Sequence, residues 1–316
     1  MTIETSPPPA PAPMALTPWR LAILTARGLV SDRRERKEEQ AQAAPAGPRR
    51  FSPRRLDPRL KAPVFILGAP RSGTTFLGSC IGALADVSYH FEPRVTKAAA
   101  QQVYEGTWSD ERAARVFRSS YGILQAAAGD GGLRFVEKNP ENCFVVPFLA
   151  RTFPDAQFVQ IIRDGRDVAV SHAEKPWLSA RSSGERRGRG GQAWGPWARW
   201  WVEPERAEEF ATGSDLTRTA WSWRRFTESA RSHLAELPAD RVLTVRYEEV
   251  VQHPETAAAE IARFFGHDAP PAPLQEALQR ANVRSIGRWR TALDADGLAD
   301  VQREAGALLE ELGYTD

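Results

Sequence analysis

The feature that most constrains this chain is a short apolar segment followed by a loop with a glycine at each end. Residues 64–67 are Val-Phe-Ile-Leu, which is typical of a buried parallel strand. The loop 68–73 follows, and from Thr74 onward apolar residues recur at the spacing of one helix face. Gly68 and Gly73 permit unusual backbone angles, so the loop amides and the helix N-terminus can point at one anion. The pattern predicts a phosphate cradle.

The loop departs from a nucleotide-hydrolysing P-loop at one position. That loop has the form G-x-x-x-x-G-K-[ST], and its lysine reaches the β- and γ-phosphates. Here the glycine spacing is kept, but a threonine follows the second glycine and an arginine lies inside the loop. This argues against ATP or GTP hydrolysis and favours a smaller tetrahedral anion. We expect the anion to be held by Arg71, Ser72, Gly73, Thr74 and Thr75.

Composition sets broad limits on the protein. The net charge of +2 over 316 residues gives no overall attraction to nucleic acid. No segment approaches the roughly 18 apolar residues of a membrane span, and the N-terminus lacks a signal-peptide pattern. Cys80 and Cys143 do not make a disulfide framework. We therefore expect a cytoplasmic protein without a transmembrane segment.

The chain divides into an N-terminal extension, residues 1–61, and a folded domain, residues 62–316. The extension begins with a Pro/Ala-rich stretch and later carries clusters of arginine, so we expect it to be disordered or partly helical. Residues 15–31 could form one amphipathic helix, and residues 32–62 have the composition of a solvated linker. An arm that contacts a partner or an anionic surface is the alternative.

The domain alternates apolar strand-like segments with helical ones. Besides 64–67, the expected strands are 87–91, 133–140, 156–164 and 241–248, each of the last three with its exit turn. Such alternation predicts an α/β fold: a P-loop-like three-layer domain with a parallel sheet of about four to five strands flanked by helices. Residues 176–225 break the rhythm. They hold several glycines and arginines, with five tryptophans between 177 and 201, and we expect an acceptor-side lid or insertion there.

Charged side chains follow several of the expected strands. In a parallel sheet, ligands bind outside the carboxyl ends of the strands. Lys138, Arg163 and Arg246 stand at such ends, and Ser171 lies one turn into the helix after Arg163. Arg163 and Ser171 can hold one phosphate from two sides. The crevice is therefore suited to a ligand with several negative charges.

These motifs together resemble the sulfotransferases that use 3′-phosphoadenosine 5′-phosphosulfate (PAPS), and within them the tyrosylprotein-sulfotransferase branch. The resemblance covers about residues 62–316. The matching segments are 68–75, 92–94, 137–140, 163–171, 246–248 and 282–289. It implies in-line transfer of a sulfuryl group from PAPS, without a metal, to a hydroxyl or amine acceptor. The acceptor would be a small molecule, glycan, lipid or peptide, no nucleic acid is involved, and a homodimer is compatible with these features.

The resemblance also implies roles for single residues. In that branch the glutamate of a Glu-x-Arg motif is the general base, which corresponds to Glu92. The lysine of a Lys-x-Pro turn contacts the sulfonate, which corresponds to Lys138, and Arg71 would stabilise the developing charge. Arg163 and Ser171 correspond to the pair that binds the 3′-phosphate of PAPS.

Two further residues are expected to contact the nucleotide. Tyr247 follows the last expected strand. Arg288 belongs to a late stretch that is Asn-Val-x-x-x-Ser-Lys-Trp in the branch and closes over the nucleotide. Here Gly287 replaces the serine, which removes one hydroxyl contact, and Arg288 replaces the lysine, which keeps the cation.

Several alternatives stay open at this point. Glu92 could instead form a surface salt bridge with Arg94, and His90 and His172 compete with it as the base. A P-loop-type kinase would suit the fold but lacks the lysine after Gly73. A non-catalytic nucleotide- or nucleic-acid-binding protein is the third alternative, since the Arg/Trp-rich segment 177–201 could stack bases.

Overall fold

A parallel sheet forms the centre of the fold. The computed structural model describes residues 14–42, 60–129 and 131–315. The sheet has five strands in the order β2-β3-β1-β4-β5, and every pair of neighbours is parallel. The strands are β1 (Val64–Leu67), β2 (Val87–Phe91), β3 (Arg134–Lys138), β4 (Gln157–Ile162) and β5 (Val242–Arg246). The predicted α/β fold with four to five parallel strands is confirmed.

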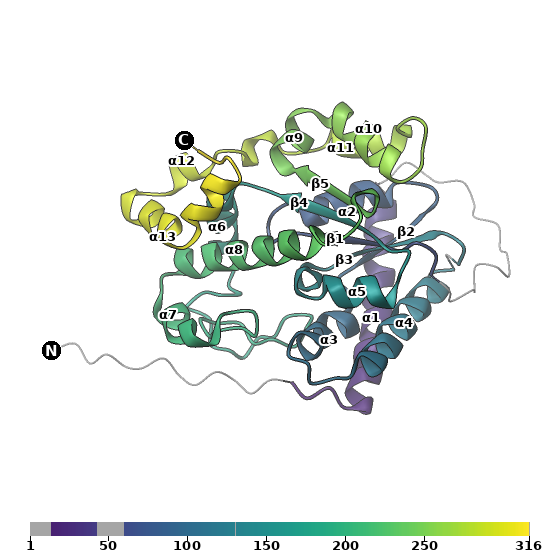
Figure 1. The fold of residues 1–316 in the computed structure, drawn as a ribbon, viewed down its shortest axis with the longest axis horizontal. Helices are drawn as coiled ribbons and strands as arrows, with labels where there is room; N and C mark the ends of the chain where they lie inside the picture. Colours follow the sequence, from purple (N-terminus) through teal and green to yellow (C-terminus); the bar gives the residue numbers. More distant parts are fainter. Residues whose placement is uncertain (1–13, 43–59, 130, 316) are drawn as a thin grey trace.

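Helices cover both faces of the sheet, as Figure 1 shows. Successive side chains of a strand point to opposite faces, so Phe65 and Leu67 enter one core while Val64 and Ile66 enter the other. The first core is completed mainly by α3 (Arg94–Tyr104), α4 (Asp110–Ala127), α5 (Val146–Thr152), α6 (Gly165–Ala173), α8 (Asp215–Leu234) and α13 (Ala295–Glu311). The second core is completed by α2 (Thr74–Gly82), α9 (Tyr247–Gln252), α10 (Pro254–Phe264) and α11 (Ala272–Leu278).

The central position of β1 places the first loop between its neighbours. β1 pairs with β3 on one side and with β4 on the other. Because all these strands run in the same direction, their carboxyl ends meet at one edge of the sheet. The segments that leave β2, β3, β4 and β5 therefore lie beside the loop 68–73, and this edge is where polar groups from distant parts of the sequence come together.

The N-terminal helix is longer than the sequence predicts and packs on the domain. α1 spans Pro18–Gln42, and Leu24 is buried in the first core. Asp32 Oδ1 lies 2.9 Å from Nδ1 of His90 in β2, and Glu35 pairs with Arg189. Residues 32–42 are thus helical, and the prediction of a solvated linker is wrong for Asp32 and Glu35, whose charges are used in ion pairs with the domain. Residues 1–13 and 43–59 lie outside the described residues.

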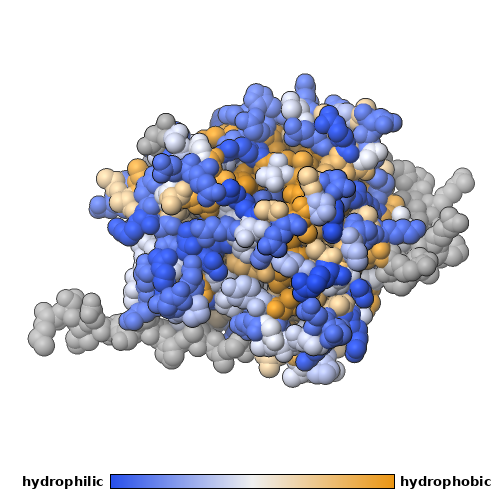
Figure 2. Space-filling view, in the orientation of Figure 1, coloured by the Kyte–Doolittle hydropathy of each residue, from blue (hydrophilic) through white to orange (hydrophobic). Residues whose placement is uncertain are grey.

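The tryptophans of the segment 176–225 are largely structural. Trp197 and Trp201 are buried, and Trp201 packs edge-on against Phe210 and Phe226. Residues 215–225 are the first half of α8, which runs through the first core. The remainder of the segment, residues 176–214, stays a predicted acceptor-side lid. On the face shown in Figure 2, hydrophilic residues surround apolar ones near the middle, an ordinary mixture for a protein surface.

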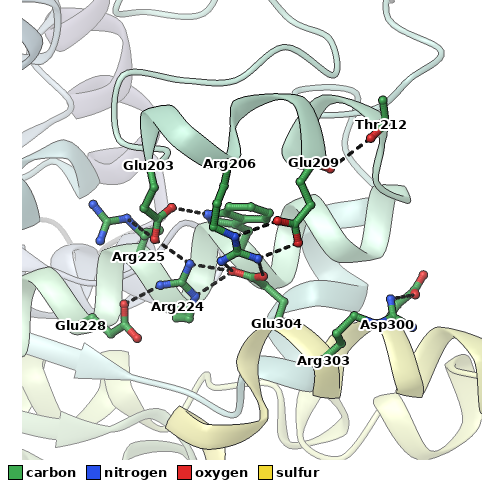
Figure 3. Close-up of polar contacts among 11 residues, drawn as sticks. Glu203, Arg206, Glu209, Thr212, Arg224, Arg225, Glu228, Asp300, Arg303 and Glu304 are labelled. Atoms are coloured by element: carbon green, nitrogen blue, oxygen red, sulfur yellow. Dashed lines mark hydrogen bonds and ion pairs between the residues drawn. The ribbon is translucent and has the colours of Figure 1, made fainter.

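A network of ion pairs connects that segment to the last helix (Figure 3). Glu304 of α13 is almost fully buried, at 3% exposure, and accepts hydrogen bonds from Arg206 and Arg224. Arg224 also contacts Glu203, whose other carboxylate oxygen accepts a hydrogen bond from Nε1 of Trp221. The network therefore joins residues 203–206, α8 and α13.

We expect Glu304→Gln to lower the free energy of unfolding by about 1–3 kcal/mol, because two cations lose a buried partner. The loss of stability stays below that of leaving a buried charge without any partner, since Arg206 keeps its ion pair with Glu209 and Arg224 keeps its ion pair with Glu203. Urea denaturation measures the change. Glu310→Gln, an exposed change on the same helix, is the control. A Glu304→Gln protein as stable as the control would contradict this account.

Candidate active site

Both glycines of the first loop are required by close contacts. A Cβ on Gly68 would lie 2.6 Å from the carbonyl oxygen of Ile161 in β4. Gly73 has a φ of 91°, and a Cβ there would lie 2.4 Å from the ring of Tyr247. Arg71, between them, also has a left-handed backbone with a φ of 74°. The loop is thus bent tightly against β4 and the end of β5, as a cradle for a small group requires.

The loop leads into a helix whose first donors face the cradle. α2 begins at Thr74, and Gly73 at its N-cap offers no side chain to cap it. The first N–H groups of a helix have no partner within the helix. Ser72 is buried, and in the described part of the chain its Oγ has no hydrogen-bond partner. Thr74 is buried and Thr75 is exposed. An unpartnered buried hydroxyl beside a helix N-terminus fits a bound anion.

Arg163 connects the loop to two other segments. It follows β4, and its side chain is buried between the loop, Tyr247 and Ser285. One terminal nitrogen donates to the carbonyl of Arg71 at 3.1 Å, and the other donates to the carbonyl of Ser285. The guanidinium lies 4.6 Å from the centre of the Tyr247 ring. Its Nε is buried without a partner among the described residues, so this N–H remains for a ligand.

Ser171 and Tyr247 complete this group. Nε of Arg71 donates to Oγ of Ser171 in α6 at 3.2 Å. The Tyr247 hydroxyl lies 2.7 Å from Oγ of Ser285. Partial burial and the neighbouring Arg163 lower the pKa of Arg71. Two arginines this close favour an anion between or beside them.

The late stretch 282–289 is held over α6 by one carboxylate. Asp167 accepts hydrogen bonds from the backbone N–H of Gly287 at 2.7 Å and of Trp289 at 3.0 Å. The Arg288 side chain is 40% exposed and pairs with Glu174 at 2.6 Å. Sequence reasoning missed Asp167 and Ser285, since nothing in their local pattern distinguishes them from other helix and loop residues.

A second group of charged residues lies at the ends of β2 and β3. Oε1 of Glu92 is 2.6 Å from Nζ of Lys138, and Oε2 is 2.8 Å from Nζ of Lys97. Lys97 also pairs with Glu141 at 3.2 Å. Glu92 has a left-handed φ of 43°, and its backbone N–H donates to the carbonyl of Lys138 at 2.8 Å. Lys97 and Glu141 were not predicted from the sequence.

The environment of Glu92 excludes one alternative and sets the charge of its carboxyl group. The carboxylate pairs with two lysines, so the alternative of a surface salt bridge to Arg94 is wrong. Burial alone would raise the pKa of Glu92, which would suit a general base, but Lys138 and Lys97 hold that pKa well below its ordinary range. Burial lowers the pKa of Lys138, while its attraction to Glu92 opposes the shift. The group is therefore a carboxylate clamped between cations.

The two histidines considered as bases are poorly placed to act. His90 is fully buried, and its nitrogens lie 2.9 Å from Ser88 Oγ and 2.9 Å from Asp32 Oδ1. Burial, and then Arg71 and Arg199, lower the pKa of His172 to about 3. His172 is therefore a neutral imidazole at neutral pH, and a weak base.

The two groups lie on the same edge of the sheet. Neighbouring strands are about 4.8 Å apart, so the ends of β3 and β4, on either side of β1, are separated by roughly 10 Å. The site residues beside the loop are Arg71, Ser72, Gly73, Thr74, Arg163, Ser171 and Tyr247, while Glu92 and Lys138 lie toward β2. A groove of about 850 Å³ beside β5, lined by Ile162, Val242 and Leu308 among others, contains none of these residues.

Comparison with known proteins identifies the family. The model described as "Sulfotransferase family" matches residues 63–271. The chain belongs to the sulfotransferase family. This confirms the resemblance found in the sequence, and neither a P-loop kinase nor a non-catalytic binding protein is favoured.

The relatives include the branch that the sequence resembles. A protein-tyrosine sulfotransferase of Drosophila melanogaster is 22% identical over 79% of this chain and 51% of its own length. Protein-tyrosine sulfotransferase 2 of Gallus gallus is 23% identical over 79% of this chain and 69% of its own length. The chain thus spans about half the length of the first relative. A solved sulfotransferase domain from the curacin biosynthetic pathway has a TM-score of 0.51 at 16% identity, over 79% of this chain and 98% of that one, and shows the same fold.

Two further observations concern membranes and metals. Across residues 14–42, 60–129 and 131–315, none of the helices combines the length and apolar character needed to cross a bilayer. In the same ranges, no group of three or more His, Cys, Asp or Glu residues is placed to hold a metal ion.

Glu137, next to Lys138, is a buried carboxyl group whose ionisation can be tested. Its buried carboxyl accepts hydrogen bonds from the Tyr121 hydroxyl at 2.5 Å, Asn142 Nδ2 at 2.7 Å and Thr96 Oγ1 at 3.2 Å. Burial raises its pKa to about 7, against an ordinary value of 4.5. Between these two values the folded protein retains a proton that the unfolded chain releases, so stability falls as pH rises.

We expect Glu137→Gln to remove the pH dependence of the unfolding free energy that Glu137 causes, which is at most about 1.4 kcal/mol per pH unit. Urea unfolding from pH 4.5 to 7 measures it: the wild-type protein should lose stability with rising pH more steeply than the variant. Glu236→Gln, an exposed change, should keep the wild-type slope. Equal slopes in all three proteins would mean that Glu137 is ionised throughout.

Proposed function

We propose that the protein transfers a sulfuryl group from PAPS to a hydroxyl or amine acceptor by in-line displacement. One observation carries the proposal. A tight loop, whose buried Ser72 hydroxyl has no partner among the described residues, lies on the same sheet edge as a carboxylate and a lysine in direct contact, Glu92 and Lys138. The loop suits the phosphosulfate group of PAPS. The contact pair of Glu92 and Lys138 suits the place where the acceptor attacks the sulfur.

The residues present fit PAPS at two places. Ser72, Thr74, Thr75 and the backbone at Gly73 would hold the 5′-phosphosulfate, with Arg71 at the side of the loop. Arg163 and Ser171 would hold the 3′-phosphate, using the Arg163 Nε that has no partner in the described part of the chain. Tyr247 packs against Gly73 and contacts Ser285, so it would shape the wall between these two places. Arg288 would contact the nucleotide after its ion pair with Glu174 breaks.

PAPS supplies the sulfuryl group: the acceptor oxygen bonds to sulfur while the bond from sulfur to the 5′-phosphate oxygen breaks, which releases 3′-phosphoadenosine 5′-phosphate (PAP). Lys138 and Arg71 would stabilise the negative charge that develops on the leaving phosphate and the sulfonate oxygens. Lys138 has three N–H donors and directs one of them at Glu92, which leaves the others for the sulfonate.

Glu92 would accept the acceptor proton and then release it to water. Its lowered pKa is compatible with this role, because the hydroxyl proton becomes strongly acidic once the new oxygen–sulfur bond forms. A carboxylate in contact with two lysines still has open lone-pair positions on both oxygens. His90 and His172 are the weaker candidates, since the first has both nitrogens engaged and the second has a pKa of about 3.

The acceptor belongs to the classes already expected: a small molecule, glycan, lipid or peptide. The proteins of Drosophila melanogaster and Gallus gallus are named for protein tyrosine, and a peptide acceptor for this chain is one case of the proposal. Residues 176–214 would line the acceptor side.

A cytoplasmic location remains a prediction, which the two free cysteines, Cys80 and Cys143, support.

The 3′-phosphate assignment can be tested by binding alone. We expect the protein to bind PAP more tightly than adenosine monophosphate without added metal, and Arg163→Ala to reduce that preference about 10- to 100-fold. Ser171→Ala should reduce it less. Isothermal titration calorimetry measures the affinities. Arg246→Ala is the matched control, since this strand-end arginine instead contacts the Leu312 carbonyl and the Tyr314 ring. Equal affinity of the wild-type protein for both nucleotides would remove the assignment.

The catalytic roles predict two different kinetic effects. Glu92→Gln keeps the shape of the side chain, so PAP affinity should be retained while turnover falls about 10²- to 10⁴-fold. Lys138→Ala removes a cation from the reacting group, so turnover and PAPS affinity should both fall. Transfer of labelled sulfate from PAPS to a simple phenol measures turnover. Transfer at the wild-type rate in Glu92→Gln would exclude Glu92 as the base.

A further inference from the structure

Lys97 has contacts that the proposed mechanism does not use. It lies in the first turns of α3, and its side chain is only 16% exposed. Its ammonium is 2.8 Å from Oε2 of Glu92 and 3.2 Å from Oε1 of Glu141. The Glu141 residue belongs to the 3₁₀ turn Pro140–Phe144 that follows β3. Lys97 therefore joins the segments that leave two neighbouring strands.

The stem of Lys97 is also confined. Gly190, in the segment 176–214, lies so close that a Cβ there would be 3.2 Å from Cγ of Lys97. A lysine held by two carboxylates and covered by backbone has little freedom to move toward a ligand. The attraction of Glu141 and Glu92 raises the pKa of Lys97 although burial opposes it, so the ammonium stays charged.

The two lysines that contact Glu92 thus differ in their other contacts. Lys138 contacts Oε1 and lies 4.0 Å over the ring of Phe91, with no second carboxylate at hydrogen-bond distance among the described residues. Lys97 contacts Oε2 and is anchored by Glu141. Glu92 has a left-handed backbone, with a φ of 43°, and such a strained conformation persists only where surrounding contacts hold it.

We propose that Lys97 is a positioning residue that fixes the Glu92 carboxylate through Oε2 and leaves the Oε1 side for Lys138 and the acceptor hydroxyl. This inference rests on the proposed function of Glu92 as the base. Lys97 touches neither donor nor acceptor in this arrangement. Its removal should therefore change the orientation and the proton affinity of Glu92 without changing how the nucleotide binds.

The charged groups around Glu92 determine the direction of the effect on pH dependence. Lys97 on α3 and Lys138 on β3 lower its pKa, while the acids nearby are Glu141 after β3 and Glu35 on α1. Removing the Lys97 charge must raise the pKa of Glu92. The base must be ionised to act, so the acidic limb of the pH–rate profile should move to higher pH.

The test compares Lys97→Met with the wild-type protein and with Lys61→Met, an exposed lysine at the amino end of β1. In Lys97→Met we expect the acidic limb of kcat to move up by about one pH unit and the plateau to fall on the order of 10- to 100-fold. KM for PAPS and the Kd for PAP should stay within about twofold. Lys97→Arg, which keeps the charge, should return the limb toward the wild-type position.

A second measurement does not depend on turnover. In protein labelled with ¹³C at the glutamate carboxyl, the Glu92 signal is identified by its absence in Glu92→Gln. It should titrate at higher pH in Lys97→Met than in the wild-type protein. If Lys97→Met does not fold, Lys97→Gln, which keeps a donor for Oε2 without the charge, takes its place in both experiments.

The outcomes separate the two proposals. A Glu92 titration and an acidic limb unchanged in Lys97→Met would overturn the role of Lys97, and so would a loss of PAP affinity equal to the loss of turnover. A wild-type protein that binds PAP but transfers sulfate to no hydroxyl or amine would overturn the proposed function, and the carboxyl titration would still decide whether Lys97 controls Glu92.

Discussion

The geometry of the candidate active site depends on two hydrogen bonds that the Arg163 guanidinium donates to backbone carbonyl groups. One belongs to Arg71 in the first loop and the other to Ser285 in the late stretch, so a single buried guanidinium joins segments from the beginning, middle and end of the domain. The face of that guanidinium lies on Tyr247, whose ring in turn excludes any side chain at Gly73. The cradle is therefore shaped by contacts between strands that are neighbours in the sheet but distant in the sequence, and the parallel arrangement of the strands makes these contacts possible.

Charge is distributed unevenly along the edge of the sheet. Around the loop, Arg71 and Arg163 lie close together; burial and the repulsion of Arg163 lower the pKa of Arg71, and an anionic ligand would offset that repulsion. At the ends of β2 and β3, two lysines and two glutamates balance one another. A donor with several negative charges would thus bind at one end of the edge, while the other end provides a carboxylate whose ionisation is already ensured by its neighbours.

The sequence predicts the parts of this arrangement that are local or that follow from strand order. Glycine spacing and an apolar segment define the cradle, and Arg163 with Ser171 forms one strand–turn–helix unit. Other parts depend on contacts that no local pattern encodes. Lys97 contacts Glu92 from the first turn of α3, and it contacts Glu141 in the segment that follows a neighbouring strand. The linker prediction fails at Asp32 and Glu35 because charged residues were assumed to face water, whereas Asp32 contacts a buried histidine and Glu35 pairs with Arg189.

The helix at the start of the chain also has a consequence for biosynthesis. α1 leaves the ribosome before any of its partners: Asp32 contacts residue 90, and Ser31 accepts a hydrogen bond from residue 189. A single helix is marginally stable in water without a packed face. α1 therefore cannot dock until the elements that cover it, chiefly β2, α3 and α4, have been synthesised. The contacts of Ser31 and Glu35 with residue 189 form only after a further stretch of the chain has been made, so a helix that is synthesised early is secured in two stages.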